Sequence, residues 1–232
     1  FNGSVLGLKL IDKGNVDNPL IELVCFSEKP FKEKEDLVKE IRWRFDLDSD
    51  ISEFCEKFEQ DSLLGPVLRK WRGMKVSCAY SLYELLVITI VLQNAPVNRS
   101  IQMMEALFGK YGTKTCYDGK ELYIFWPPER LHEATEEELR ALKVGYRAKN
   151  LKRISENFVN NEVDEYKLRT LDKEEAKKQL MRLYGVGPAS VSILLFELLH
   201  HYDALDEVFP WEQKIYSRLL FGKELVSPQM IL

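Results

Sequence analysis

Apolar and polar residues follow two different patterns along the chain. Val5 to Ile11 and Leu20 to Phe26 are short apolar runs rich in Val, Ile and Leu, and the turn-forming residues between them predict a β-hairpin. From residue 32 onward, apolar residues recur with helical spacing, first in 32–45 and then in 51–58. The pattern predicts a mainly α chain with a small N-terminal antiparallel β element, an α+β fold. We expect a β-rich N-terminal domain at 1–70 and a helical domain at 71–232.

Residues that favour helix starts divide the second part into several helices. Ser, Thr, Asp or Asn at the N-cap, Glu three residues later, and Pro at the first helical position are the usual marks of a start. The chain carries them at Ser81 with Glu84, Asn98, Pro128, Thr135 with Glu138, and Asp172 with Glu175. The helix after Asp172 is expected to have an apolar stripe of Ala176, Leu180, Leu183 and Tyr184. Between two of these helices, 117–126 predicts an irregular or extended segment.

The helix that starts after Ser81 has a defined end. Its apolar run reaches Leu92, and Pro96 disfavours a helical conformation for the residue before it. Gln93 and Asn94 are therefore expected on a loop at the helix end, with their polar side chains available to a ligand.

A Gly-Val-Gly turn joins the helix after Asp172 to a long apolar run. Gly185 is expected to end the first helix, because the residue after a helix often needs a positive φ. Gly187 can cap the next helix and Pro188 can be its first residue, and the apolar run to residue 200 predicts that this helix is buried. Such a turn directs backbone N–H groups and a positive helix end outward, which suits one phosphate group. A plain corner between two helices is the alternative.

Composition indicates an ordinary soluble globular protein. The 232 residues are 45% hydrophobic, and no apolar run of 18 residues or basic N-terminal leader predicts a membrane span or signal peptide. Four scattered cysteines without metal-ligand spacing predict reduced thiols and a cytoplasmic (nucleoid-associated) or nuclear location. The three histidines also lack partners at such spacing, so no metal site is predicted. The net charge of −4 gives no support to nucleic-acid binding, so only local basic clusters could provide it. These are Arg140, Lys143, Arg147, Lys149, Lys152 and Arg153, and then Lys214, Arg218 and Lys223.

Four blocks together resemble the helix-hairpin-helix DNA glycosylases. The blocks are Leu92-Gln93-Asn94-Ala95-Pro96-Val97, Val144-Gly145-Tyr146-Arg147-Ala148-Lys149, Leu183-Tyr184-Gly185-Val186-Gly187-Pro188-Ala189 and Phe209-Pro210-Trp211-Glu212-Gln213-Lys214. Their order is that of the family, and they are most similar to the 3-methyladenine glycosylases of the AlkA type and the 8-oxoguanine glycosylases. The resemblance implies base excision repair, with double-stranded DNA containing a damaged base as the partner of a monomeric enzyme that needs no cofactor. The β-rich start is also typical of these two branches.

The resemblance assigns roles to particular residues. It implies that DNA is bound by Gly185, Val186, Gly187, Lys214, Gln93 and Asn94. Asn94, with Gln93 beside it, falls where the family places the residue that fills the gap left by an extruded base. The base pocket would be lined by Ala189, Ile193 and Trp211. In the family a monovalent cation often bridges the hairpin carbonyls and the phosphate. The catalytic carboxylate falls on Glu212, where it would stabilise positive charge on the sugar and orient water.

Two departures from the family pattern affect the expected chemistry. Glu212 stands where the family has aspartate, and the longer segment before it leaves Asp203, Asp206 and Glu207 as rivals. Bifunctional members carry a lysine at the position of Ala189, so no Schiff base and no lyase step are expected here. We therefore expect a monofunctional glycosylase that removes a damaged purine. An alkylated purine is the first choice of substrate and an oxidised purine is the second. The alternatives are a damaged-DNA-binding protein with weakened activity and a helical protein-interaction module.

Overall fold

The structure is a computed structural model that describes residues 5–27, 32–204 and 208–232. Its contacts form two compact units, Phe1–Ala79 and Tyr80–Leu232, which are described separately. The division falls nine residues after the boundary at residue 70 that the sequence suggested. The mainly α fold with a small N-terminal antiparallel β element is confirmed.

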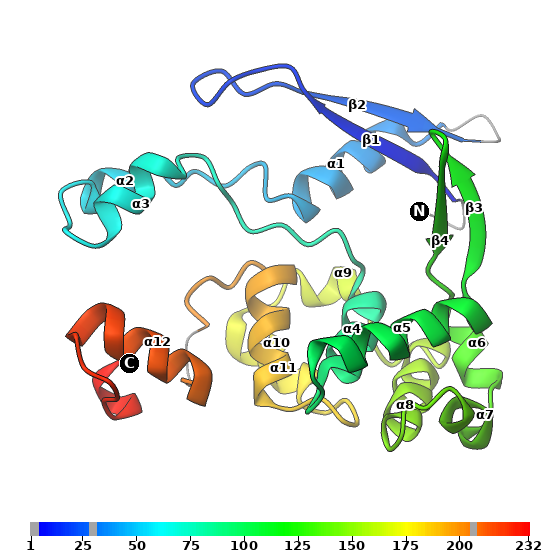
Figure 1. The fold of residues 1–232 in the computed structure, drawn as a ribbon. Coiled ribbons are helices and arrows are strands. Elements are labelled where there is room, and N and C mark those ends of the chain that lie inside the picture. Colours follow the sequence, from blue (N-terminus) through cyan, green and yellow to red (C-terminus); the bar gives the residue numbers. More distant parts are fainter. Residues whose placement is uncertain (1–4, 28–31, 205–207) are drawn as a thin grey trace. The chain divides into compact units, whose positions relative to one another are not determined.

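The first unit begins with the predicted β-hairpin. Strands β1 (Gly7–Asp12) and β2 (Ile21–Phe26) are antiparallel, with Gly7 opposite Phe26 and Asp12 opposite Ile21 (Figure 1). Helices α1 (Lys34–Arg44) and α2 (Ser52–Phe58) follow as predicted. A third helix, α3 (Leu64–Lys70), was not predicted, because a glycine and a proline in its first turn lower its helix propensity. The Asp61 carboxylate accepts hydrogen bonds from the N–H groups of Leu63 and Leu64, both 2.8 Å long, and so holds this helix start.

Helix α4 (Leu82–Leu92) lies at the centre of the second unit (Figure 1). The predicted capping box at its start is confirmed: Ser81 N–H donates to Glu84 Oε2 (2.7 Å), and Glu84 N–H donates to Ser81 Oγ (3.3 Å). Apolar residues on all sides of α4 are buried, namely Leu82, Tyr83, Leu85, Leu86, Val87, Ile90 and Val91. The helix contacts α5, α8 and α11, so its end is firmly positioned by the core.

Helix α5 (Val97–Tyr111) starts earlier than the sequence suggested. Pro96 occupies the N-cap in an extended conformation, and its carbonyl accepts hydrogen bonds from Arg99 N–H (2.9 Å) and Ser100 N–H (3.1 Å). Asn98 is therefore inside the first turn, and its predicted capping role is wrong. Proline suits the position because it needs no hydrogen-bond acceptor for its own nitrogen.

A second β-hairpin lies where an irregular or extended segment was expected at 117–126, and its strand β4 is extended while the pairing with β3 was not predicted. Strands β3 (Thr113–Tyr117) and β4 (Lys120–Ile124) pair antiparallel. Asp118 and Gly119 join them with φ values of 48° and 73°. Two positive φ values in a two-residue loop are typical of the type I′ turn, for which Asp-Gly is a favoured sequence. The dipeptide was the available signal for this hairpin.

The next helices are α6 (Pro128–Glu133), α7 (Glu136–Ala141) and α8 (Arg147–Val159). The capping box of α7 is confirmed, with Thr135 N–H donating to Glu138 Oε2 (2.8 Å) and Glu138 N–H donating to Thr135 Oγ1 (3.1 Å). Lys152 of α8 donates to the carbonyls of His132 (2.6 Å) and Ala134 (2.8 Å). Part of the basic run on α8 therefore holds helix ends within the fold.

The remaining helical segments precede and follow the Gly-Val-Gly turn in the sequence. They are α9 (Glu165–Leu168), α10 (Lys173–Leu180), α11 (Pro188–Ile193), the π-helical segment η1 (Leu194–Leu198), α12 (Pro210–Phe221) and the 3₁₀ turn η2 (Pro228–Met230). In the three described ranges of the chain, no helix has the length and apolarity that crossing a membrane requires.

Candidate nucleic-acid interface

The helix before the Gly-Val-Gly turn is shorter than predicted. Asp172 caps α10 by accepting a hydrogen bond from Glu175 N–H (2.9 Å). The reciprocal half of the capping box was expected from the Glu175 carboxylate, but this group accepts a hydrogen bond from Gln179 Nε2 (3.2 Å) instead. The helix ends at Leu180, so Tyr184 lies beyond it with 46% of its surface exposed. Its expected place on the buried stripe is therefore wrong.

The two glycines of the turn meet different requirements. Gly185 has a φ of +80°, as predicted, and a Cβ atom there would lie 2.5 Å from Asn150 Nδ2. The fold itself therefore needs glycine at this position. Gly187 caps α11 in an extended conformation (φ −107°, ψ 177°), and a Cβ atom there would meet nothing within 4 Å. Since the fold leaves open space beside Gly187, a ligand could approach its backbone closely.

The backbone donors of the turn are only partly used. Val186 N–H donates to the Leu183 carbonyl (3.2 Å), and the Val186 side chain is buried. Across the described part of the chain, the N–H groups of Gly187 and Ala189 have no hydrogen-bond acceptor. These two donors flank Pro188 at the positive end of α11, so the turn can bind an anion there.

The loop after α4 contacts this turn directly. Gln93 Nε2 donates to the Gly185 carbonyl (2.8 Å), although the two residues are 92 positions apart. The next residue, Asn94, is exposed and adopts a left-handed conformation with φ +49°, which asparagine tolerates better than most residues. Its Nδ2 lies 3.5 Å from the hydroxyl oxygen of Tyr146, which is itself 54% exposed. Tyr146 was not singled out from the sequence, although it belongs to the Gly-Tyr-Arg-Ala block.

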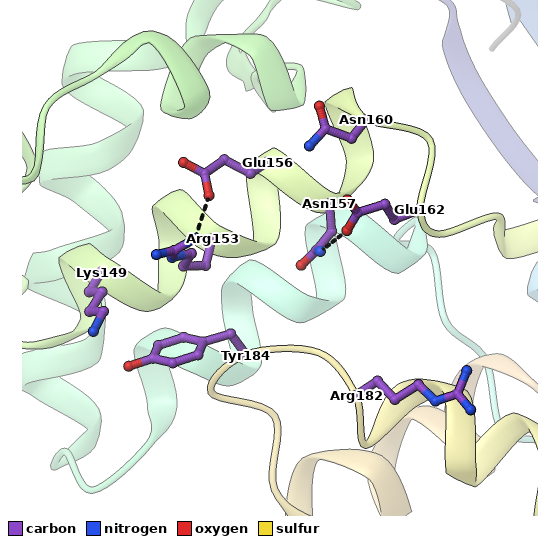
Figure 2. Close-up of a pocket in the computed structure, with 8 residues that line it drawn as sticks. All are labelled: Lys149, Arg153, Glu156, Asn157, Asn160, Glu162, Arg182 and Tyr184. Atoms are coloured by element: carbon purple, nitrogen blue, oxygen red, sulfur yellow. Dashed lines mark hydrogen bonds and ion pairs between the residues drawn. The ribbon is translucent and has the colours of Figure 1, made fainter.

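A groove of about 300 Å³ lies between α8 and the segment that leads into the turn (Figure 2). Figure 2 shows its lining: Lys149, Arg153, Glu156, Asn157, Asn160, Glu162, Arg182 and Tyr184. The Lys149 ammonium lies over the Tyr184 ring, 5.1 Å from its centroid, and Arg153 pairs with Glu156 at 3.4 Å. Neither Lys149 nor Arg182 forms a salt bridge within the described ranges, so Lys149 presents positive charge beside Tyr184, while Glu162 in the same lining is negative.

Helix α12 carries the predicted catalytic residue. The half-buried Glu212 is in its first turn, and its Oε2 accepts a hydrogen bond from Phe209 N–H (3.0 Å). Trp211 and Lys214 beside it are exposed. Among the described residues, the hydrogen bonds of α12 all lie within residues 209–226, so none joins this helix to the turn.

The other predicted site residues lie as follows. Ala189 and Ile193 are exposed and one helical turn apart on α11, while the other face of this segment is buried through Ser190, Val191, Leu194 and Leu195. Asp203 is exposed and pairs with Lys173 at 3.3 Å. The remaining rivals of Glu212, Asp206 and Glu207, lie outside the described residues. In the described part of the molecule, no group of three or more His, Cys, Asp or Glu residues could hold a metal ion.

Comparison with known proteins identifies repair enzymes as relatives. The chain is 26% identical over 178 residues to the DNA-3-methyladenine glycosylase of Bacillus subtilis, covering 75% of this chain and 59% of that protein. It is 24% identical over 214 residues to a probable N-glycosylase/DNA lyase of Methanothermobacter thermautotrophicus, covering 84% of this chain and 68% of the relative.

Solved structures share the fold. The 3-methyladenine DNA glycosylase from Archaeoglobus fulgidus matches 100% of this chain and 77% of its own, with a TM-score of 0.75 and 18% identity. The 8-oxoguanine glycosylase/lyase of Clostridium acetobutylicum, in complex with double-stranded DNA, matches 99% of this chain and 77% of its own, with a TM-score of 0.72 and 24% identity. The family model of the HhH-GPD superfamily of base excision DNA repair proteins matches residues 87–222, more than half of the 232 residues. The chain therefore belongs to the HhH-GPD superfamily of base excision DNA repair proteins.

Proposed function

We propose that this protein is a DNA N-glycosylase that removes a damaged purine from double-stranded DNA. The observation that carries the proposal is the geometry at Gly187, where open space, two free backbone donors and a positive helix end coincide. These features suit a DNA phosphate, and the chain belongs to a family of base excision repair proteins. The relatives from Bacillus subtilis and Archaeoglobus fulgidus are named for 3-methyladenine, which supports an alkylated purine as the first substrate and an oxidised one as the second.

Base excision requires the damaged nucleotide to leave the duplex. In our proposal, the protein acts as a monomer, and the N–H groups of Gly187 and Ala189 bind a phosphate of the DNA backbone. The Asn94 side chain enters the space that the extruded base leaves. Tyr146 lies beside Asn94 and belongs to the same exposed surface. A monovalent cation, if bound, would be held by carbonyl oxygens of the turn and would add positive charge near the phosphate; the chemistry itself requires no cofactor.

Glu212 supplies the proposed catalytic carboxylate. When the glycosidic bond breaks, positive charge develops on the sugar, and a carboxylate stabilises this charge and orients the attacking water. Ala189 has only a methyl group and cannot form a Schiff base with the sugar. The proposed reaction is therefore hydrolysis without a lyase step.

A test of the proposal is base release from duplexes that each carry one lesion, including an alkylated purine and 8-oxoguanine. We expect release from at least one alkylated duplex, and no covalent protein-DNA adduct after borohydride treatment. A trapped adduct would refute the assignment as a monofunctional enzyme. Duplex binding without release of any base would favour a damaged-DNA-binding protein with weakened activity, and absence of duplex binding would favour a protein-interaction module.

One observation favours a second candidate, a damaged-DNA-binding protein with weakened activity. The Glu212 carboxylate is already engaged by Phe209 N–H, and its side chain is one methylene longer than the family's aspartate. A displacement of about 1 Å at a catalytic group can reduce the rate by roughly 10²-fold. Steady-state rates of base release distinguish this weakened protein from a full enzyme.

The groove in Figure 2 gives a prediction for DNA binding. Lys149 and Arg182 line this groove and form no salt bridge in the described ranges, although the Glu175 carboxylate acts on Arg182 electrostatically, so each is expected to contact the DNA backbone. Lys149→Ala and Arg182→Ala should each weaken binding to damaged and undamaged duplexes equally, and lower the slope of log K against log salt by about 0.9.

Fluorescence anisotropy titrations at several salt concentrations measure this slope. Lys120→Ala on β4 is the matched control, because it removes the same charge from an exposed position that is not part of the groove lining. Equal slopes for the parent protein and both groove variants would show that the groove does not contact DNA.

A further inference from the structure

Gln93 connects the end of α4 to the Gly-Val-Gly turn. Its side-chain amide donates a 2.8 Å hydrogen bond to the Gly185 carbonyl, and the side chain is half-buried. The hydrogen bond directs the polar end of Gln93 toward the protein. This is unlike Asn94, the next residue, which is exposed.

The backbone of Gln93 is held independently by α8. Arg147 is buried and donates from Nε to the Ile90 carbonyl (3.2 Å) and from Nη2 to the Gln93 carbonyl. The Ile90 carbonyl also accepts a hydrogen bond from Gln93 N–H (3.3 Å), so Arg147 holds both the last turn of α4 and the residue that follows it. Gln93 is therefore fixed by its main chain on one side and by its side chain on the other.

The turn is also fixed against α8. Asn150 packs so closely on Gly185 that no Cβ atom could be placed there. Gly187, with its free N–H group, is only two residues further along. Gln93 thus forms a short connection between the proposed phosphate site and the exposed Asn94.

We propose that Gln93 is a positioning residue that sets Asn94 at the right place relative to the phosphate site, and does not itself contact DNA. The inference rests on the proposed function, because it assigns a role within the same site. When a duplex is held at Gly187, the Gln93–Gly185 hydrogen bond keeps Asn94 in line with the base that is to be extruded. Without the bond, the loop samples other positions and extrusion is less complete.

Gln93→Met tests the proposal, because methionine keeps the length of the side chain and removes the donor. We expect unchanged affinity for undamaged duplex and an unchanged salt slope, with extrusion weakened roughly fivefold to tenfold, the usual worth of one hydrogen bond. Fluorescence of 2-aminopurine beside a lesion reports extrusion. Gln179→Met is the matched control, since Gln179 is also half-buried and its amide bonds only within α10.

A second substitution separates positioning from a general effect on the fold. Asn94→Gly removes the proposed gap-filling side chain, and glycine accepts the φ of +49° without strain. Alone, it should reduce extrusion and leave phosphate binding intact. If Gln93 acts only through Asn94, then Gln93→Met should cause no further loss in the Asn94→Gly background.

Hydrogen exchange in the free protein provides a readout that needs no DNA. Amides of residues 93–95 should exchange faster in Gln93→Met than in the parent or in the control. Three results would overturn the proposal: a reduced salt slope for Gln93→Met, additive losses in the double variant, or unchanged exchange in the loop. If coupling and exchange behave as expected but the parent releases no base, the glycosylase proposal fails and the positioning role stands.

Discussion

Gly187→Asp is expected to abolish duplex binding and to leave the protein folded. The conformation of Gly187 is extended and its surroundings are open, so an aspartate side chain can be placed without strain. Aspartate is also a favourable N-cap residue, which supports the start of α11. In the proposed complex, however, its carboxylate would occupy the phosphate position, and like charges in contact cost several kcal/mol. Affinity should therefore fall by roughly 100-fold or more.

Anisotropy with an undamaged duplex measures this loss, and circular dichroism verifies the fold. Gly187→Ala separates bulk from charge, because it adds a Cβ atom alone and should cause a smaller loss. Gly109→Asp is the matched charge control: a Cβ atom there also meets nothing within 4 Å, but the residue lies in α5. If folded Gly187→Asp binds duplex as the parent does, the turn is only a corner between helices.

Local signals explain why much of the fold could be predicted from the sequence. The capping boxes at Ser81 and Thr135 and the positive φ of Gly185 depend on residues within a few positions of each other. The same is true of Pro128 at the first position of α6. Where such signals were overlooked, as with the Asp-Gly turn of the second hairpin, an element was missed although its cause is local.

Contacts between distant segments could not be predicted in this way. The hydrogen bond from Gln93 to Gly185 depends on how α4 and the turn pack, and no spacing rule reports it. Arg147 belonged to a basic run, yet it is buried and donates hydrogen bonds to the carbonyls of Ile90 and Gln93. The sequence therefore identified the candidate site residues, and only the structure shows that Gln93 faces the protein and Asn94 the solvent.

Glu212→Gln is expected to bind lesion DNA and to release almost no base. Glutamine keeps the shape of the side chain and can still accept the hydrogen bond from Phe209 N–H, so α12 should be retained. The substitution removes the negative charge that would stabilise the oxocarbenium-like transition state. Loss of such a group reduces the rate by roughly 10³-fold or more, so single-turnover base release should fall by that factor while the affinity for lesion duplex stays unchanged.

Glu138→Gln is the control that separates catalysis from helix capping. Glu138 has the same position in the first turn of α7 as Glu212 has in α12, and it accepts the same kind of backbone hydrogen bond, from Thr135 N–H at 2.8 Å. Both substitutions remove a charge from a helix N-terminus, so each should lower the stability slightly and to a similar degree. Similar melting temperatures with activity lost only in Glu212→Gln would support a catalytic role. Full base release by Glu212→Gln would show that Glu212 only caps α12, and would transfer the catalytic role to Asp203, Asp206 or Glu207.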